Sequence, residues 1–146
     1  MIKFRAWDKE TNKYFEPTYQ VYMGRLEDLA IGLSGRLQKR TCRGVVDESV
    51  FPGRYVVEQF TGLTDVNGKD IYENDIIHFG SIWCVGDEYD PREEEHIGAV
   101  KYRTDCASYE VNCNGQIFPL MEVINFDGYS VQGNVHENPE LLEAGK

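Results

Sequence analysis

Residues 55–79, YVVEQFTGLTDVNGKDIYENDIIHF, carry the strongest β-sheet signal in the chain. The segment Tyr55–Phe60 is rich in β-branched and aromatic residues, which are typical of strands. Asn67 and Gly68 follow it, and because both residues tolerate positive φ angles, the pair predicts a tight hairpin turn. The apolar run Asp75–Phe79 then predicts the next strand. This stretch therefore indicates antiparallel β structure.

More short strands are predicted on the C-terminal side of this stretch. They cover residues 81–85, 98–103, 109–112 and 116–118, with a final hairpin from residues 120–124 and 129–135. Residues 87–95 predict an acidic loop in which Asp90 and Pro91 favour one helical turn, and Asn138-Pro139 predicts a short terminal helix. The core is expected from these residues: Trp7, Phe60, Leu63, Ile71, Tyr72, Ile76, Ile77, Val100, Val123, Ile124 and Val135.

The N-terminal part gives a mixed prediction. Apolar and charged residues alternate in Ile2–Trp7, which predicts a half-buried strand, and Tyr19–Met23 predicts another. Apolar residues at helical spacing predict a short helix over residues 26–33. Residues 34–54 contain several glycines and cations without a clear apolar period, so they predict a basic loop or linker.

These segments together predict a mainly β protein with two parts. Residues 1–54 are expected to form an N-terminal α+β subdomain that ends with the basic linker. Residues 55–146 are expected to form a small β-barrel domain with a short C-terminal helix, since many short strands at regular spacing indicate a sheet or barrel.

The 146-residue chain has a formal net charge of −10, distributed unevenly. Residues 1–57 hold ten basic and seven acidic residues (net +3), whereas residues 58–146 hold five and eighteen (net −13). The acidic total disfavours general nucleic-acid binding. Opposite charges on two parts of one chain favour contact between copies, so we expect a homo-oligomer. No apolar run reaches the roughly 18 residues of a membrane span and the charged N-terminus is unlike a secretory signal, so we expect a cytoplasmic protein without membrane contact.

Motifs of common enzyme classes are missing from the sequence. There is no phosphate-binding loop, dinucleotide-binding fingerprint or nucleophile elbow, and the segment after His136 lacks the second histidine of a zinc protease. The cysteines at 42, 84, 106 and 113 are not at zinc-ligand spacing and are expected to be free thiols. A cysteine–histidine pair distant in sequence stays open. We therefore predict no enzymatic activity, no cofactor and no metal site.

Four cations within eight residues form the candidate partner-binding segment: Arg36, Lys39, Arg40 and Arg43. They suit the phosphates of a nucleic acid, although the aromatic residues of a single-strand platform are missing between them. They also suit pairing with the acidic loop at residues 87–95. The positions of these cations on the folded surface distinguish the two interpretations.

The segment Glu58–Ile77, EQFTGLTDVNGKDIYENDII, resembles the YopX family of phage and prophage proteins. That family shows Gln-aromatic-Thr-Gly-Leu-x-Asp-x-Asn-Gly followed by Ile-Tyr-Glu-Gly-Asp-Ile. Asn74 stands where glycine is usual, and asparagine also tolerates the left-handed conformation. Lys3–Asp8 is similar to the family's N-terminal Phe-Arg-x-Trp-Asp. Gln132–Leu142 is similar to its closing Ile-Gly-Asn-Ile-Tyr-Glu-Asn-Pro-Glu-Leu, with His136 replacing the usual tyrosine and Gln132 the usual isoleucine.

This resemblance implies a mostly β fold, with a small SH3-like barrel in the C-terminal part and a smaller N-terminal α+β portion. It implies no catalytic residues. Together with the missing motifs and the acidic residues 58–146, it leads us to expect a non-catalytic accessory or regulatory factor that binds a protein partner of phage or host. The alternative is a nucleic-acid-binding module that uses the basic residues 36–43 on a small β-barrel.

Overall fold

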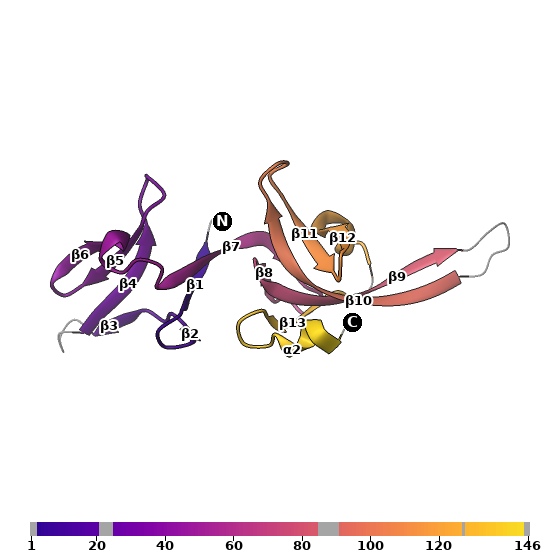
Figure 1. The fold of residues 1–146 in the computed structure, drawn as a ribbon, viewed down its shortest axis with the longest axis horizontal. Helices are drawn as coiled ribbons and strands as arrows, with labels where there is room; N and C mark the ends of the chain where they lie inside the picture. The colour runs from indigo at the N-terminus through magenta and orange to yellow at the C-terminus, as the bar shows by residue number, and fades with distance from the viewer. Residues whose placement is uncertain (1–2, 21–24, 85–90, 127, 145–146) are drawn as a thin grey trace. The chain divides into compact units, whose positions relative to one another are not determined.

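The computed structural model describes residues 3–20, 25–84, 91–126 and 128–144 (Figure 1). Strands hold 57% of the chain and helices 9%, so the protein is mainly β, as the sequence predicts. No helix in these ranges is long and apolar enough to span a membrane. Two compact units are formed: the N-terminal unit, Arg5–Val57, and the C-terminal unit, Met1–Phe4 with Glu58–Lys146. The division predicted at residues 54 and 55 stays a prediction.

Short antiparallel strands build the N-terminal unit. They are β1 (Phe4–Asp8), β2 (Lys13–Tyr14), β3 (Thr18–Gln20), β4 (Arg25–Ile31), β5 (Leu37–Thr41) and β6 (Gly44–Asp47), followed by the one-turn 3₁₀ helix η2 (Glu48–Val50). The strands β3-β4-β5-β6 pair in that order in one sheet. The predicted strand over residues 2–7 is confirmed over Phe4–Trp7. Of the predicted strand Tyr19–Met23, only Tyr19 and Gln20 lie among the described residues, and both belong to β3.

Residues 26–33 are not the predicted helix, because Arg25–Ile31 form strand β4. The apolar residues at helical spacing do not share a buried face: Leu29 is buried, Ala30 is exposed and Leu33 is fully exposed. Strand β4 pairs with β3 on one side and with β5 on the other, so its backbone groups are satisfied by neighbours. Pairing within the sheet therefore overrides the weak local helix signal.

The prediction of a basic loop over residues 34–54 is also wrong. This stretch contains β5, β6 and η2, and β5 and β6 form a hairpin whose turn ends at Gly44 with φ 124°. Only Leu37 of β5 is buried, so the apolar residues show no alternation that a sequence pattern could reveal. Arg36 and Arg40 are held instead by Asp47 and Asp28 of neighbouring strands, and these contacts depend on the register.

The C-terminal unit contains a curled sheet that forms a half-barrel (Figure 1). Its elements are β7 (Tyr55–Thr64), β8 (Asp70–Tyr72), β9 (Asp75–Cys84), β10 (Pro91–Arg103), β11 (Ser108–Cys113), β12 (Gln116–Pro119), α1 (Leu120–Val123), β13 (Ser130–Asn134) and α2 (Glu140–Ala144). The curled sheet has the order β12-β11-β10-β9-β13. Similarity of this half-barrel to an SH3 barrel stays a prediction.

Two local predictions in this unit are wrong. Residues 120–124 do not form a strand: Leu120–Val123 form helix α1, because one helical turn directs both Leu120 and Val123 into the core. The last strand, β13, pairs with β9 instead. Residues 91–95 of the predicted acidic loop belong to strand β10 and pair with residues 80–84 of β9. The helical turn predicted at Asp90 and Pro91 begins outside the described residues, and Pro91 itself starts β10.

The core lies in the C-terminal unit between the curled sheet and α1. Its members are Ile71, Ile77, Phe79, Val100, Val111, Cys113, Leu120 and Val123. Among the predicted core residues, Trp7, Ile71, Ile76, Ile77, Val100 and Val123 are buried, and Phe60, Leu63, Tyr72, Ile124 and Val135 are half-buried. The predicted terminal helix is present as α2.

The hairpin turn predicted at Asn67 and Gly68 joins β7 to β8, with Gly68 at φ 81°. Asp65, which is only 5% exposed, organises it. Its Oδ1 accepts hydrogen bonds from the backbone N–H groups of Asn67 and Lys69, both at 2.9 Å, and its Oδ2 accepts one from Val131 of β13 at 3.0 Å. One carboxylate thus fixes the turn and holds it against the last strand.

We expect Asp65→Asn to lower the free energy of unfolding by about 1–3 kcal/mol at neutral pH, because a buried backbone donor loses its acceptor. Burial opposes ionisation of Asp65, but the three backbone hydrogen bonds outweigh it and hold its pKa below the usual value. The ionised carboxylate therefore stabilises the fold above about pH 4, and this contribution disappears as the pH falls through the lowered pKa.

Urea denaturation of both proteins at several pH values tests this. The difference between wild type and Asp65→Asn should shrink as the solution is acidified, whereas Glu16→Gln, at an exposed position, should match wild type throughout. A difference that does not change with pH contradicts the assigned role of the carboxylate.

Candidate functional site

Three residues of the segments that carry the family resemblance meet inside the C-terminal unit. Glu58 of β7 is fully buried, and its Oε2 accepts a hydrogen bond from the side-chain amide of Asn74 at 2.5 Å. His136 places Nε2 2.9 Å from the same oxygen. Lys101 of β10 donates to Oδ1 of Asn74 at 2.7 Å. These side chains hold each other, so we assign them a structural role.

Asn74 adopts φ 67°, the left-handed conformation expected at the position where the resembling family has glycine. Its backbone N–H donates to the carbonyl of Val100, and its carbonyl accepts from the N–H of Val135. The turn before β9 is therefore bonded to β10 on one side and to the segment after β13 on the other. The expectation that asparagine preserves this turn is confirmed.

The four cations of the candidate segment do not form one surface. Arg36 makes a two-pronged contact with Asp47, with Nε–Oδ1 at 3.0 Å and Nη2–Oδ2 at 2.6 Å. This contact holds the pKa of the Asp47 carboxyl well below its usual value. Arg40 lies opposite Asp28 in the β4–β5 register, with Nη2–Oδ2 at 3.7 Å. Two of the four cations are thus compensated within the N-terminal unit.

Lys39 and Arg43 lie apart from these pairs. Lys39 neighbours Arg40 along β5, so it projects from the opposite face of the sheet. Arg43 is in the turn after β5 and lines a shallow pocket with Arg25 and Glu27. Within the C-terminal unit, Glu95 lies near His78 and Glu94 near His96, and the predicted pairing of the cations with this acidic segment stays a prediction.

Strand β10 extends past the end of strand β11 in the curled sheet. It pairs with β11 from Ala99 to Arg103 and with β9 from Pro91 to Ala99. Strand β13 pairs with β9 only up to His78. In the part of the chain that the structure describes, residues 79–84 and 91–96 therefore pair only with each other. We call this two-stranded segment the ribbon arm; it extends past the sheet in Figure 1.

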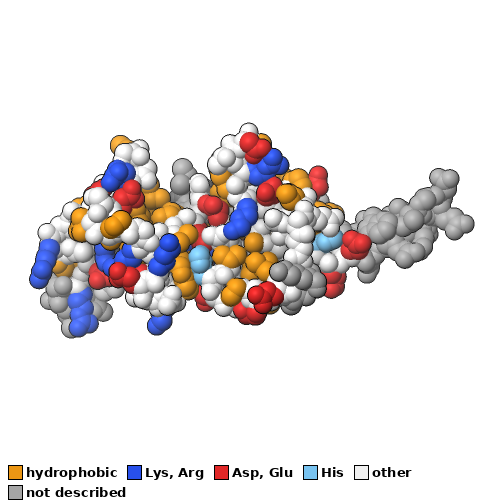
Figure 2. Space-filling view, viewed as in Figure 1, with side chains coloured by type: hydrophobic (Ala, Val, Ile, Leu, Met, Phe, Trp, Pro, Cys, Tyr) orange, Lys and Arg blue, Asp and Glu red, His pale blue; other side chains and the backbone are white. Residues whose placement is uncertain are grey.

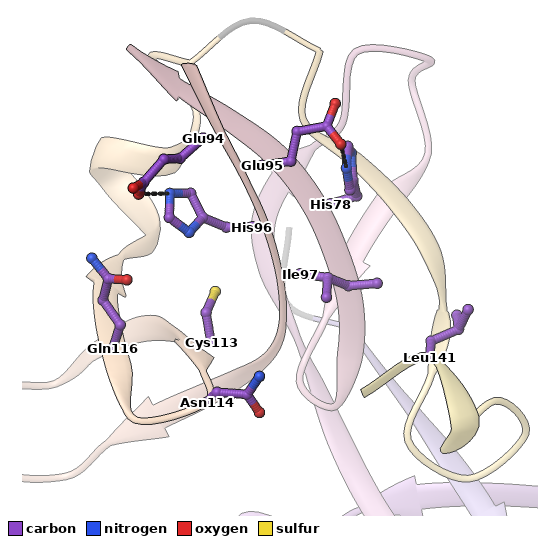
Figure 3. Close-up of a pocket in the computed structure, with 9 residues that line it drawn as sticks. All are labelled: His78, Glu94, Glu95, His96, Ile97, Cys113, Asn114, Gln116 and Leu141. Carbon is purple, nitrogen blue, oxygen red and sulfur yellow. Dashed lines mark ion pairs between the residues drawn. The ribbon is translucent and has the colours of Figure 1, made fainter. Parts of the chain in front are cut away.

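A pocket of about 630 Å³ lies where β11 ends and the β10 edge continues. Glu94–Ile97 of β10, Cys113, Asn114 and Gln116 line it, together with His78, and Leu141 of α2. Figure 3 shows Glu94 and His96 on the same side of β10 as Cys113 and Gln116, and Glu95 with His78 on the other. Acidic side chains thus flank both faces of the strand at this edge.

The geometry of the pocket does not favour nucleophilic chemistry. Cys113 is buried, and burial raises the pKa of its thiol to about 11, so almost no thiolate exists at neutral pH. The ring of His96 packs against Phe79 and Phe118, with centroids at 5.2 and 4.7 Å. Its Nε2 lies 3.8 Å from a carboxylate oxygen of Glu94. The cysteine–histidine alternative from the sequence finds no support here.

Sequence reasoning missed the β10 edge because Glu93–Glu95 looked like a solvated acidic loop. The available signal was the apolar run Ser81–Val85, which required an antiparallel partner somewhere in the chain. Hairpin pairing supplies that partner immediately after the connecting residues. No sequence pattern indicated that β11 would end early and leave the edge open.

Comparison with known proteins identifies relatives over nearly the whole chain. The YopX protein family matches residues 3–143. The crystal structure of protein EF1440 from Enterococcus faecalis is similar, with 28% identity, a TM-score of 0.55 and coverage of 97% of this chain and 98% of that one. The crystal structure of YopX from Bacillus subtilis shares the fold, with 21% identity, a TM-score of 0.56 and coverage of 95% and 94%. A comparison with curated proteins finds no match.

The segments that resemble the family shape the C-terminal unit: they hold the turn around Asn67 and Gly68, the left-handed Asn74, and the contact of buried Glu58 with His136. The structural comparisons agree with this fold over both units. Since the family match extends over residues 3–143, the chain belongs to the YopX protein family.

Proposed function

We propose that this chain is a non-catalytic factor that binds a protein partner along the open edge of the ribbon arm. The observation that carries the proposal is the β10 edge at residues 91–97, which has no strand partner among the described residues. An unpaired strand edge presents a row of backbone donors and acceptors and can take an extended segment of another chain as an additional strand. The adjoining pocket provides room for side chains of that segment.

The charge of the edge indicates what the partner carries. Glu94 and Glu95 are exposed and project from opposite faces of β10, so both faces of an added strand would meet a carboxylate. A partner strand with Lys or Arg at successive positions complements them. Two copies of this edge placed side by side would instead bring like charges together. The homo-oligomer predicted from the sequence therefore calls for another surface, and it stays a prediction.

The nucleic-acid-binding alternative is less well supported. Arg36 and Arg40 are engaged by Asp47 and Asp28, and Lys39 projects from the other face, so the segment offers no continuous basic stripe. Phosphate-driven binding weakens steeply with salt, which separates this alternative from protein binding in a direct experiment.

A photo-crosslinking amino acid in place of Gln116, beside the β10 edge, tests the partner site. In a lysate of its native cells we expect one covalent adduct of defined mass. Charge inversion by Glu94→Lys with Glu95→Lys should reduce it by about tenfold, because both acidic contacts become repulsive. The matched inversion Glu122→Lys with Glu140→Lys, at exposed positions elsewhere in the unit, should leave it unchanged.

The same photo-crosslinking amino acid in place of Met121, an exposed residue on α1, controls for the position of the crosslinker. Equal adducts from positions 116 and 121, or equal loss in both inverted variants, would show that the edge is not the site. Salt-sensitive retardation of DNA or RNA in a gel, with no protein adduct, would instead favour the nucleic-acid alternative.

The non-catalytic part of the proposal predicts an unreactive Cys113. At about pH 8, iodoacetamide should alkylate Cys113 about a hundredfold more slowly in the native chain than in guanidinium chloride, because burial both raises its pKa and blocks access. The exposed Cys42 and Cys106 provide internal controls in the same digest, read by mass spectrometry. Rapid native modification of Cys113 would make it a candidate nucleophile.

A further inference from the structure

We propose a second binding site, in the N-terminal unit, for an acidic protein segment that carries a large apolar side chain. A pocket of about 670 Å³ lies among the turn after β1, strands β5 and β6, and the loop between η2 and β7. Cations line its rim and apolar residues its floor: Lys9, Lys39 and Arg54, with Val46, Val50 and Phe51. This site is separate from the ribbon arm and does not depend on the function proposed above.

The two lysines of the rim are uncompensated. Neither Lys9 nor Lys39 forms an ion pair or a side-chain hydrogen bond in the described ranges of the chain. Lys39 lies opposite Val46 in the β5–β6 register, so both project from the same face, away from the Arg40–Asp28 pair. The N-terminal unit holds nine basic and seven acidic residues, and three of its other cations, Arg36, Arg40 and Arg54, form ion pairs with acidic side chains. Lys9 and Lys39 are therefore available to an external carboxylate.

Contacts with neighbouring side chains hold Arg54 in place at the rim of the pocket. Its Nε and Nη2 donate to the two carboxylate oxygens of Asp8, at 3.1 and 3.0 Å, and Nε also lies 3.3 Å from Glu10. The guanidinium packs over the ring of Tyr55, 5.1 Å from its centroid. Asp8 is only 4% exposed, so this contact fixes the wall of the pocket rather than competing for the ligand.

The floor of the pocket is apolar and partly open. Val50 is 69% exposed, so its apolar surface is open to a ligand. Phe51 beside it packs edge-on against Tyr55, with centroids 5.6 Å apart, and Val46 is half-buried. A large apolar side chain of a ligand would cover Val50 and Phe51 while neighbouring carboxylates reach the lysines.

The chemistry of the rim favours an acidic protein segment over a nucleic acid. Among the described cations that line the pocket, only Lys9 and Lys39 are unpaired, and Glu10 also lines it, so a long row of phosphates would meet a carboxylate after two contacts. Figure 2 shows Lys and Arg side chains over the N-terminal unit on the visible face, interspersed with Asp and Glu. Such a surface selects short acidic sequences by charge and anchors them by apolar contact.

NMR titration of the ¹⁵N-labelled full chain tests the site with a defined probe, the peptide Ac-Glu-Glu-Phe-Glu-Glu-NH₂. We expect saturable shifts confined to residues 9–10, 39–41 and 50–54. The peptides Ac-Gln-Gln-Phe-Gln-Gln-NH₂ and Ac-Glu-Glu-Ser-Glu-Glu-NH₂ should each bind about tenfold more weakly, because one lacks the charge and the other the anchor.

Matched variants separate a specific site from general attraction. Lys9→Gln with Lys39→Gln should abolish the shifts, whereas Lys13→Gln with Arg43→Gln, which removes the same charge outside the pocket, should keep them. The spectra themselves report whether each variant is folded. Equal loss in both variants, shifts scattered over the chain, or stronger binding of a short single-stranded DNA to the same residues would each overturn the proposal.

Discussion

A fully buried carboxyl group, that of Glu58, sets the arrangement of the C-terminal unit. Burial of a carboxyl group without partners is strongly unfavourable, so the groups that satisfy it must be brought together wherever they lie in the sequence. Asn74 and His136 supply these groups from the turn before β9 and from the segment after β13. Both contacts reach the same buried oxygen, Oε2 of Glu58, and this shared contact links the distant segments in one cooperative structure.

This constraint determines where the curled sheet begins and where it ends. The turn at Asn74 aligns the start of β9 with Val100 of β10, and β13 is held beside β9 by the segment that carries His136. The core residues Ile77, Phe79 and Val100 lie on the strands next to this turn. Beyond His78 no further strand is held in place among the described residues, and β9 and β10 continue as the ribbon arm. On the other side of β10 the edge is open because β11 pairs only with residues 99–103.

Sequence patterns predicted the elements that depend on local chemistry. The turn at Gly68 and the strand over Tyr55–Phe60 were predicted correctly because their residue types strongly favour these conformations. The strand β4 and the helix α1 were mispredicted because four to eight apolar residues fit a helix and a strand equally well, and pairing with distant neighbours decided between them. The core was predicted well where β-branched residues cluster, as at Ile76 and Ile77.

The candidate sites depend on the register of the strands, that is, on which residues lie opposite each other. A single sequence does not show this register. The contact of Arg36 with Asp47 connects strands on either side of a hairpin, and Lys9 reaches the pocket of Lys39 from thirty positions away. A cluster of cations in the sequence was therefore divided by the alternation of faces along β5. The family match over residues 3–143 agrees with the fold, and Glu58, Asn74 and Asp65 in the segments that resemble the family all have structural roles.

Hydrogen–deuterium exchange of the free chain tests the open β10 edge most directly. In β9, the amides of residues 76–78 lie between β10 and β13, whereas those of residues 91–97 in β10 have one neighbouring strand in the described structure. The account predicts that half of the amides over residues 91–97 exchange rapidly while those over residues 76–78 stay protected. Protection of every amide over residues 91–97 to the level of residues 76–78 would show that the edge is already covered and would contradict the proposed partner site.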